Sequence, residues 1–140
     1  ALEVAKYNNG KNNTNVRFIE SNLFENIQEQ KFNIIVSNPP YIRSDVINKL
    51  SKQVQNEPHL ALDGGEDGLK FYKKIIEQAC NYIENGYLIL EIGYDQKEDV
   101  ENLLKENKNY SEIKTIHCKI ICFMIFVIKI QCYYFILKSK

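Results

Sequence analysis

FNIIVSNPPYI, residues 32–42, places an apolar run directly before two adjacent prolines. Residues 32–36 carry β-branched side chains on both faces, which is typical of a strand covered on both sides in a parallel sheet. Pro39 and Pro40 have no backbone N–H and a fixed φ, so a sheet cannot continue through them. The stretch therefore predicts a buried strand that ends in a rigid loop.

Strand and helix patterns alternate along the rest of the chain. The expected elements are, in chain order, the end of a helix over residues 1–9, a short strand over 16–19, a helix over 69–83, a two-sided strand over 87–92 and a helix over 95–104. Gly86 lies where a helix terminator is expected, and Asp95 with Glu98 resembles a capping box. This alternation is typical of a parallel α/β domain, which binds ligands beyond the carboxyl ends of its strands. Residues 38–41 lie at such an end.

The composition indicates a globular domain without a metal site. The chain has 140 residues, of which 44% are hydrophobic, and a formal net charge of zero, so nothing global favours a polyanionic partner. Its cysteines form no CxxC pair and have no zinc-like spacing to the histidines; they are Cys80, Cys118, Cys122 and Cys132. Residues 1–10 lack the basic and apolar regions of a signal peptide, and reduced thiols fit a cytoplasmic protein.

The C-terminal segment has a different composition. The nearly apolar run over residues 120–137 is about as long as a short membrane span, but Lys129 and Gln131 interrupt it. A pair of apolar strands is therefore favoured over a membrane span, although no turn residues mark a hairpin. If such a strand formed an exposed edge, we expect it to be prone to aggregate.

The residues that follow the strand suit one kind of chemistry, methyl transfer to a planar amino group. Such a nitrogen is a poor nucleophile, and hydrogen-bond acceptors beside its N–H groups help it toward tetrahedral geometry. Asn38 offers a side-chain carbonyl and Pro39 a backbone carbonyl, while Pro40 stiffens the loop and the Tyr41 ring can pack on a flat substrate. Asn38, Pro39 and Tyr41 are therefore the candidate catalytic residues. The alternative is that these residues form only a rigid turn.

SNPPY resembles the catalytic motif of class I S-adenosylmethionine-dependent methyltransferases that modify amide or exocyclic nitrogens. Together with VRFIESNLFENI, NEPHLALDGGEDGLKFYKKII and GYLILEIGYDQ, it makes residues 1 to about 114 similar to the protein-(glutamine-N5) methyltransferases of the HemK/PrmC type. The resemblance implies a Rossmann-like α/β fold and S-adenosylmethionine as methyl donor. It also implies a partner, the GGQ loop of peptide chain release factors, whose glutamine accepts the methyl group.

The resemblance also assigns roles to residues. Asn38 would bind the glutamine amide and border the donor, and Pro39, Pro40 and Tyr41 would complete the substrate pocket. Leu23 would lie against the adenine of the donor, so that Leu23 and Asn38 are the candidate cofactor-binding residues. Asn22 replaces the acidic residue that is usual before Leu23. The stretches 57–58 and 63–68 would cover the substrate cleft.

Some family features are absent from this sequence. The family has a glycine-rich loop after the first strand and an acidic residue after the second, whereas the only Gly-Gly pair here is Gly64-Gly65, downstream of NPPY. We therefore expect residues 1–114 to be an incomplete catalytic domain that lacks the first two strands, with most of the donor site outside this chain. Residues 115–140 depart from the family ending, and either a strand pair or a shifted reading frame would explain them.

Two other functions remain open. One is a DNA or RNA amino-group methyltransferase acting on adenine N6 or guanine N2, since NPPY serves any planar amine. Against a nucleic-acid partner, only Arg43, Lys49 and Lys52 lie near the motif, without a basic stripe. The other is an inactive remnant with no donor site. No membrane partner is expected.

Overall fold

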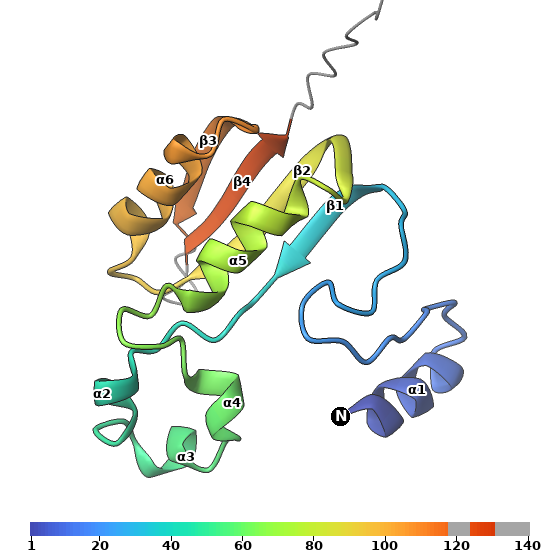
Figure 1. The fold of residues 1–140 in the computed structure, drawn as a ribbon. Coiled ribbons are helices and arrows are strands. Elements are labelled where there is room, and N and C mark those ends of the chain that lie inside the picture. The colour runs from blue at the N-terminus through green and yellow to red at the C-terminus, as the bar shows by residue number, and fades with distance from the viewer. Residues whose placement is uncertain (118–123, 131–140) are drawn as a thin grey trace, which may run out of the picture. The chain divides into compact units, whose positions relative to one another are not determined.

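The computed structural model describes residues 1–117 and 124–130 and divides into two units, with the boundary after Gln30 (Figure 1). The first unit contains α1 (Leu2–Lys11), followed by chain without regular structure. The predicted helix is thus confirmed, and it continues through Gly10 to Lys11. The strand predicted over residues 16–19 is wrong, because a strand needs a hydrogen-bonded neighbour and no described strand pairs with this segment.

The second unit contains a four-stranded sheet in the order β1-β2-β4-β3. Its strands are β1 (Phe32–Ser37), β2 (Ile83–Ile92), β3 (Tyr110–His117) and β4 (Met124–Ile130). β1 and β2 are parallel, whereas β4 is antiparallel to both β2 and β3. The helices of this unit are α2 (Ser44–Ile47), α3 (Lys52–Gln55), α4 (His59–Leu62), α5 (Lys70–Ala79) and α6 (Lys97–Glu106).

The core lies between the sheet and the helices α5 and α6, which lie on one face of it (Figure 1). Alternate residues of β2 face this core, and Leu88, Leu90 and Ile92 have no exposed surface. On the opposite face, Ile34 and Val36 of β1 are 54% and 70% exposed. The prediction that both faces of this strand are covered is therefore not met among the described residues, because both long helices pack on the same side.

The boundary between α5 and β2 differs from the predicted one. α5 ends at Ala79, and Ile83 begins β2 instead of ending the helix. Ile83 pairs with Phe32 and Tyr87 pairs with Ile34, so β2 has two extra residues in a bulge that contains Gly86. A Cβ on Gly86 would lie 2.2 Å from the backbone oxygen of Asn33. Gly86 therefore permits a close approach of two strands, and the prediction of a helix terminator is wrong.

The predicted capping box at Asp95 and Glu98 is also wrong. α6 begins at Lys97 with Gln96 as its N-cap, and no side chain caps the first turn. The acidic residues Glu98 and Asp99 lie in that turn, where they complement the positive end of the helix dipole.

Part of the C-terminal segment is an interior strand. β4 forms hydrogen bonds with β2 on one side and β3 on the other, so residues 124–130 are not an exposed edge. The remaining residues of this segment, 118–123 and 131–140, lie outside the described residues. Among the described helices, none is long and apolar enough to cross a membrane.

Candidate active site

Asn38 lies one residue beyond the end of β1, at the carboxyl edge of the parallel strand pair. Its side chain is exposed, and among the described residues no hydrogen bond involves its amide or the backbone carbonyl of Pro39. The ring of Pro39 is buried, and Pro40 is partly buried. The two prolines therefore hold two hydrogen-bond acceptors at the strand end, and no donor from the described residues binds to them.

The Tyr41 side chain is a neutral phenol in its surroundings. Burial raises the pKa of Tyr41 to about 12, and the nearby charge of Glu91 adds to the increase. Behind it, the hydroxyl of Tyr72 donates a 2.8 Å hydrogen bond to the backbone oxygen of Glu91. Tyr41 can therefore supply a flat apolar surface and a hydroxyl, but it does not act as a base near neutral pH.

A second loop, residues 63–68, lies against the chain that follows Tyr41. The Ile42 N–H donates to the oxygen of Leu62 at 3.0 Å, and the Gly64 N–H donates to the oxygen of Ile42 at 2.8 Å. Ile42 and Asp63 thus form an isolated parallel bridge. The loop expected to cover the substrate cleft is therefore joined to the NPPY segment by backbone hydrogen bonds.

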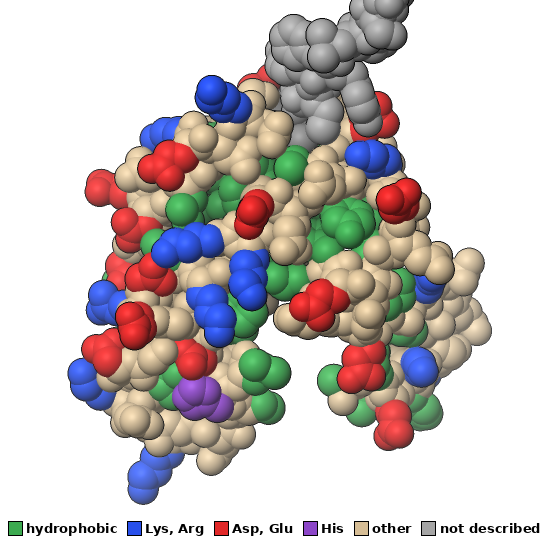
Figure 2. Space-filling view, viewed as in Figure 1, with side chains coloured by type: hydrophobic (Ala, Val, Ile, Leu, Met, Phe, Trp, Pro, Cys, Tyr) green, Lys and Arg blue, Asp and Glu red, His purple; other side chains and the backbone are tan. Residues whose placement is uncertain are grey.

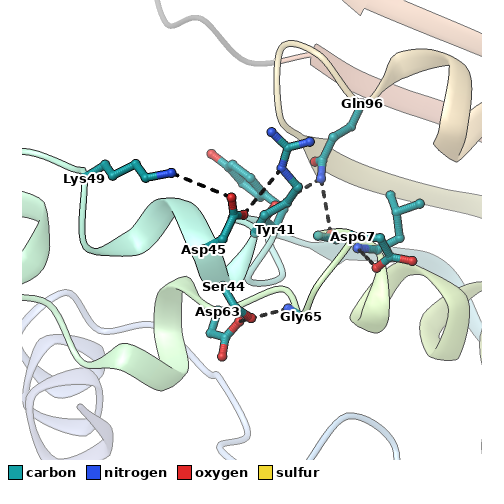
Figure 3. Close-up of polar contacts among 11 residues, drawn as sticks. Tyr41, Ser44, Asp45, Lys49, Asp63, Gly65, Asp67 and Gln96 are labelled. Carbon is teal, nitrogen blue, oxygen red and sulfur yellow. Dashed lines mark hydrogen bonds and ion pairs between the residues drawn. The ribbon is translucent and has the colours of Figure 1, made fainter.

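Asp63 connects this loop to the start of α2. Its carboxylate accepts hydrogen bonds from the Ser44 hydroxyl at 2.7 Å and from the Gly65 N–H at 2.9 Å (Figure 3). The Ser44 hydrogen bond, followed by that of Gly65, holds the pKa of Asp63 below its usual value. The ionised carboxylate is therefore the form that the folded loop favours.

Three glycines allow the segments around Tyr41 to approach closely. A Cβ on Gly64 would lie 2.8 Å from the Tyr41 backbone, and a Cβ on Gly68 would lie 2.6 Å from the Tyr41 oxygen. Gly68 also has a φ of +72°, which favours glycine. A Cβ on Gly93 would lie 2.8 Å from Oε1 of Gln96. The DGGEDG stretch is therefore needed for packing against the NPPY segment, in addition to any role over a cleft.

Gln96 lies where three segments meet, and Figure 3 shows its side chain directed at two of them. Its Nε2 donates to the backbone oxygens of Tyr41 at 3.0 Å and Gly68 at 3.2 Å. Its Oε1 accepts from the Gly93 N–H at 3.0 Å. One buried side chain thus joins the NPPY segment, the 63–68 loop and the end of β2.

A cleft of about 400 Å³ opens beside Tyr41. Apolar side chains of Val46 and Leu50 line one part of it, and Asp95 and Asp99 line another. Because Tyr41 itself is part of the wall, a ligand in this cleft would contact the ring that sequence reasoning assigned to substrate packing.

Leu23, the other candidate cofactor-binding residue, lies in the first unit. It is partly buried in a turn and has a φ of +53°, which is rare for leucine. The Ser21 hydroxyl accepts from the Asn26 N–H at 2.9 Å, and Asn22 donates to Glu25 at 2.6 Å. Leu23 and Asn38 belong to different units, so their shared contact with the donor stays a prediction.

The sequence did not reveal Gln96 or Ser44 as part of the site. Both contact backbone or side-chain groups that are distant in sequence, Gln96 reaching Tyr41 across 55 positions. The available signal was the concentration of glycines in residues 64–68 together with the Gly93 to Gln96 turn, since glycines indicate close backbone approach.

The face of the molecule in Figure 2 shows no stripe of charges of one sign. On the face in Figure 2, lysine and arginine side chains are interspersed with acidic ones over α5, α6 and the short helices. Within residues 1–117 and 124–130, no group of three or more His, Cys, Asp or Glu could hold a metal ion.

The chain is similar to known methyltransferases. The family described as methyltransferase small domain matches residues 1–66, which include NPPY. A release factor glutamine methyltransferase from Thermodesulfovibrio yellowstonii is 45% identical over 106 residues, covering 74% of this chain and 38% of that protein. A ribosomal protein uL3 glutamine methyltransferase from Francisella tularensis is 46% identical over 99 residues, covering 69% and 32%. The chain thus spans about a third of the length of these curated relatives.

The same fold occurs in a solved structure. The crystal structure of a methyltransferase from Pyrococcus furiosus superimposes with a TM-score of 0.67 at 24% identity, covering 94% of this chain and 57% of that one. At this identity the likeness shows the fold alone, and it confirms the predicted α/β class I methyltransferase fold. The sequence matches confirm the predicted resemblance to glutamine methyltransferases of the HemK/PrmC type.

Proposed function

We propose that this chain, which is similar in sequence to the HemK/PrmC-type glutamine methyltransferases, supplies the methyl-acceptor part of an S-adenosylmethionine-dependent methyltransferase active site. The acceptor group is the side-chain amide of a glutamine. The observation that carries the proposal is a pair of hydrogen-bond acceptors at the carboxyl end of β1, the Asn38 amide oxygen and the Pro39 carbonyl, to which no donor within residues 1–117 and 124–130 binds.

These acceptors suit the reaction. A glutamine amide nitrogen carries two N–H groups, and the oxygens of Asn38 and Pro39 accept from them, which orients the nitrogen and favours tetrahedral geometry. The donor supplies a methyl group that is ready for transfer. Tyr41, as a neutral phenol, packs against the flat amide, while Pro40 keeps the loop rigid. The proton leaves the nitrogen after methyl transfer and passes to solvent, since the motif contains no base.

The donor would contact Asn38 and Leu23. The left-handed φ of Leu23 fits such a role, because residues in sparsely populated backbone regions cluster at ligand sites. Leu23 can provide an apolar surface for adenine, and Asn38 would border the transferred methyl group.

We propose a peptide chain release factor as the partner that carries the glutamine, because relatives of 45% and 49% identity bear the name release factor glutamine methyltransferase. Ribosomal protein uL3 is the second candidate, since one relative of similar identity bears that name. Release factors and ribosomal protein uL3 both take part in translation, which favours the cytoplasm as the place where this protein acts. The 400 Å³ cleft beside Tyr41 would receive residues that flank the glutamine.

A methylation assay tests the proposal. The protein that contains this chain, expressed from its whole reading frame, is incubated with methyl-labelled S-adenosylmethionine and either a release factor, uL3, DNA or RNA. We expect label in the release factor, and its loss in Asn38→Ala but not in Asn102→Ala, which alters an exposed asparagine on α6. Label in uL3 alone would replace the proposed partner. Label in nucleic acid alone, or none in any acceptor, would refute glutamine methylation.

A further inference from the structure

We infer that Gln96 is the positioning residue of the acceptor site, because it holds the NPPY segment and the 63–68 loop in one fixed arrangement. The inference rests on the proposed function, and it adds a residue outside the motif to that site. Gln96 is among the residues that line the cleft beside Tyr41, but its amide is directed at backbone groups, so we assign it a role that acts through the backbone of Tyr41.

Both ends of the Gln96 side-chain amide make hydrogen bonds. Only 6% of the residue is exposed. Both N–H groups of its amide donate to backbone oxygens, of Tyr41 and Gly68, and its oxygen accepts from the Gly93 N–H. The Gly93 donor fixes which end of the amide is the oxygen, so the amino end has to face the two carbonyls.

The NPPY segment needs an anchor of this kind. Pro39 and Pro40 have no backbone N–H, so these two positions supply no backbone donor that could hold the segment. Backbone hydrogen bonds hold the chain at Ile42, which pairs with residues 62–64. The Gln96 amide acts one residue earlier, at the Tyr41 carbonyl, and thereby fixes the peptide plane that follows the prolines.

The same amide also fixes the opposite side of the site. Because Gly68 and Tyr41 share one amino group, a displacement of the 63–68 loop would displace the NPPY segment with it. The close approach depends on a missing Cβ at Gly68, where a methyl group would lie 2.6 Å from Gln96 Nε2. The hydrogen bond from Gln96 to Gly68 therefore requires a glycine at position 68.

The role is specific to a glutamine. Glutamate has the same length but no N–H, and it would direct a negative charge at two carbonyl oxygens. Leucine has a similar volume and would leave the Gly93 N–H and the two oxygens without their present partner. Gln96 is also the N-cap of α6, but its side chain makes no capping hydrogen bond, so the substitutions do not remove a helix cap.

The first measurement is steady-state methyl transfer by the whole protein with Gln96→Glu, Gln96→Leu and Tyr110→Phe. Tyr110→Phe is the matched control, since it removes a buried hydroxyl that donates to the Ile76 oxygen, away from the site. We expect kcat to fall about tenfold to a hundredfold in both Gln96 variants, as misplacement of reacting groups does, with KM for the donor within about twofold. Tyr110→Phe should lower the melting temperature and leave kcat unchanged. An equal loss of kcat in Tyr110→Phe, or none in the Gln96 variants, would overturn the inference.

The second measurement does not depend on activity. Amide hydrogen exchange is followed in the same protein at Gly93, Ile42 and Gly64, whose N–H groups lie in or beside the Gln96 network, and at Leu88 in the centre of β2. In Gln96→Leu we expect exchange about tenfold faster at the first three amides and unchanged at Leu88. Uniform acceleration, or none, would show that Gln96 does not position the loops.

The two measurements separate the inference from the proposed function. If the unaltered protein methylates no glutamine while the exchange pattern is as expected, the proposed function fails and the positioning of the loops by Gln96 stands. If the unaltered protein methylates glutamine and Gln96→Leu accelerates exchange uniformly, the proposed function stands and the inference about Gln96 fails.

Discussion

Pro39 and Pro40 explain why an apolar strand ends beside two hydrogen-bond acceptors, the exposed side chain of Asn38 and the backbone carbonyl of Pro39. Their rings end the ladder between β1 and β2, and in the part of the chain that the structure describes no donor binds to the carbonyl of Pro39 or the side chain of Asn38. At this scale the candidate hydrogen-bond acceptors follow from residue types alone, which is why Asn38 and Pro39 could be proposed from the sequence, and their role in catalysis stays a prediction.

The supporting residues could not be predicted in the same way. Gln96 and Ser44 are polar residues of ordinary type, and their importance comes from partners 55 and 19 positions away. No local pattern encodes such a contact, since spacing rules describe neighbours along one helix or strand. The glycines at 64, 65 and 68 indicate a close approach of backbone, but the sequence does not say which segment approaches them.

The hydrogen bond between Ser44 and Asp63 has a measurable pH signature. Folding lowers the pKa of Asp63, so its contribution to stability is present above the usual carboxyl pKa and is lost as pH falls through the folded value. Ser44→Ala should raise the pKa of Asp63 toward its usual value and reduce this loss of stability in acid. NMR titration of the Asp63 carboxyl carbon measures the shift. Ser51→Ala, at an exposed serine, is the control, and an unchanged Asp63 pKa in Ser44→Ala would contradict the assignment.

Two glycines should respond in opposite directions to the same substitution. Gly68→Ala places a Cβ against Tyr41 and Gln96 at a φ of +72°, so we expect a loss of about 1–3 kcal/mol in the free energy of unfolding. Gly10→Ala meets no atom within 4 Å and lies in α1, where it should add about 0.5–1 kcal/mol to helix stability. Urea unfolding measures both. A neutral Gly68→Ala would argue against the close approach of the three segments.

At the scale of elements, helical periodicity predicted that α5 and α6 exist but not where they end. The apolar spacing of α5 continues into Ile83, although that residue belongs to β2. Periodicity cannot distinguish a buried strand residue from one more helical turn, and Gly86 has a strand role that only the register reveals. The capping-box pattern failed at α6, where no side chain caps the first turn and the Gln96 side chain binds neighbouring loops.

The packing of α6 against the sheet should carry much of the stability of the second unit. Leu104 has no exposed surface and lies one turn after Val100, so both face the core. Leu104→Ala should cost about 2–5 kcal/mol in the free energy of unfolding, because it leaves a cavity. Leu60→Ala is the control, since Leu60 is 80% exposed and should change stability by less than about 0.5 kcal/mol. Equal effects in urea unfolding would contradict the assignment of the core.

At the scale of the whole molecule, the α/β class followed from the alternation of patterns, and the antiparallel β4 did not. Residues 124–130 read as an apolar run without turn signals, yet they lie between β2 and β3. An apolar run without alternation or turn residues gives no indication of the direction of a strand or of its partners.

Residues 1–140 contain the candidate acceptor loop but no glycine-rich loop upstream of it. We therefore predict that the 140-residue chain alone binds S-adenosylmethionine weakly or not at all. Isothermal titration calorimetry measures this directly. Micromolar binding by this chain would show that its own residues make a donor site and would contradict the prediction.

The most direct test of glutamine methylation is to locate the methyl group on the product. The protein that contains this chain is incubated with S-adenosylmethionine and a release factor, and peptides of the release factor are sequenced by tandem mass spectrometry. We predict one added methyl group on the side chain of the GGQ glutamine, and none when Asn38→Ala replaces the unaltered protein. A methyl group on any other residue, or an unmodified glutamine beside methylated nucleic acid, would contradict the central claim that Asn38 and Pro39 hold a glutamine amide.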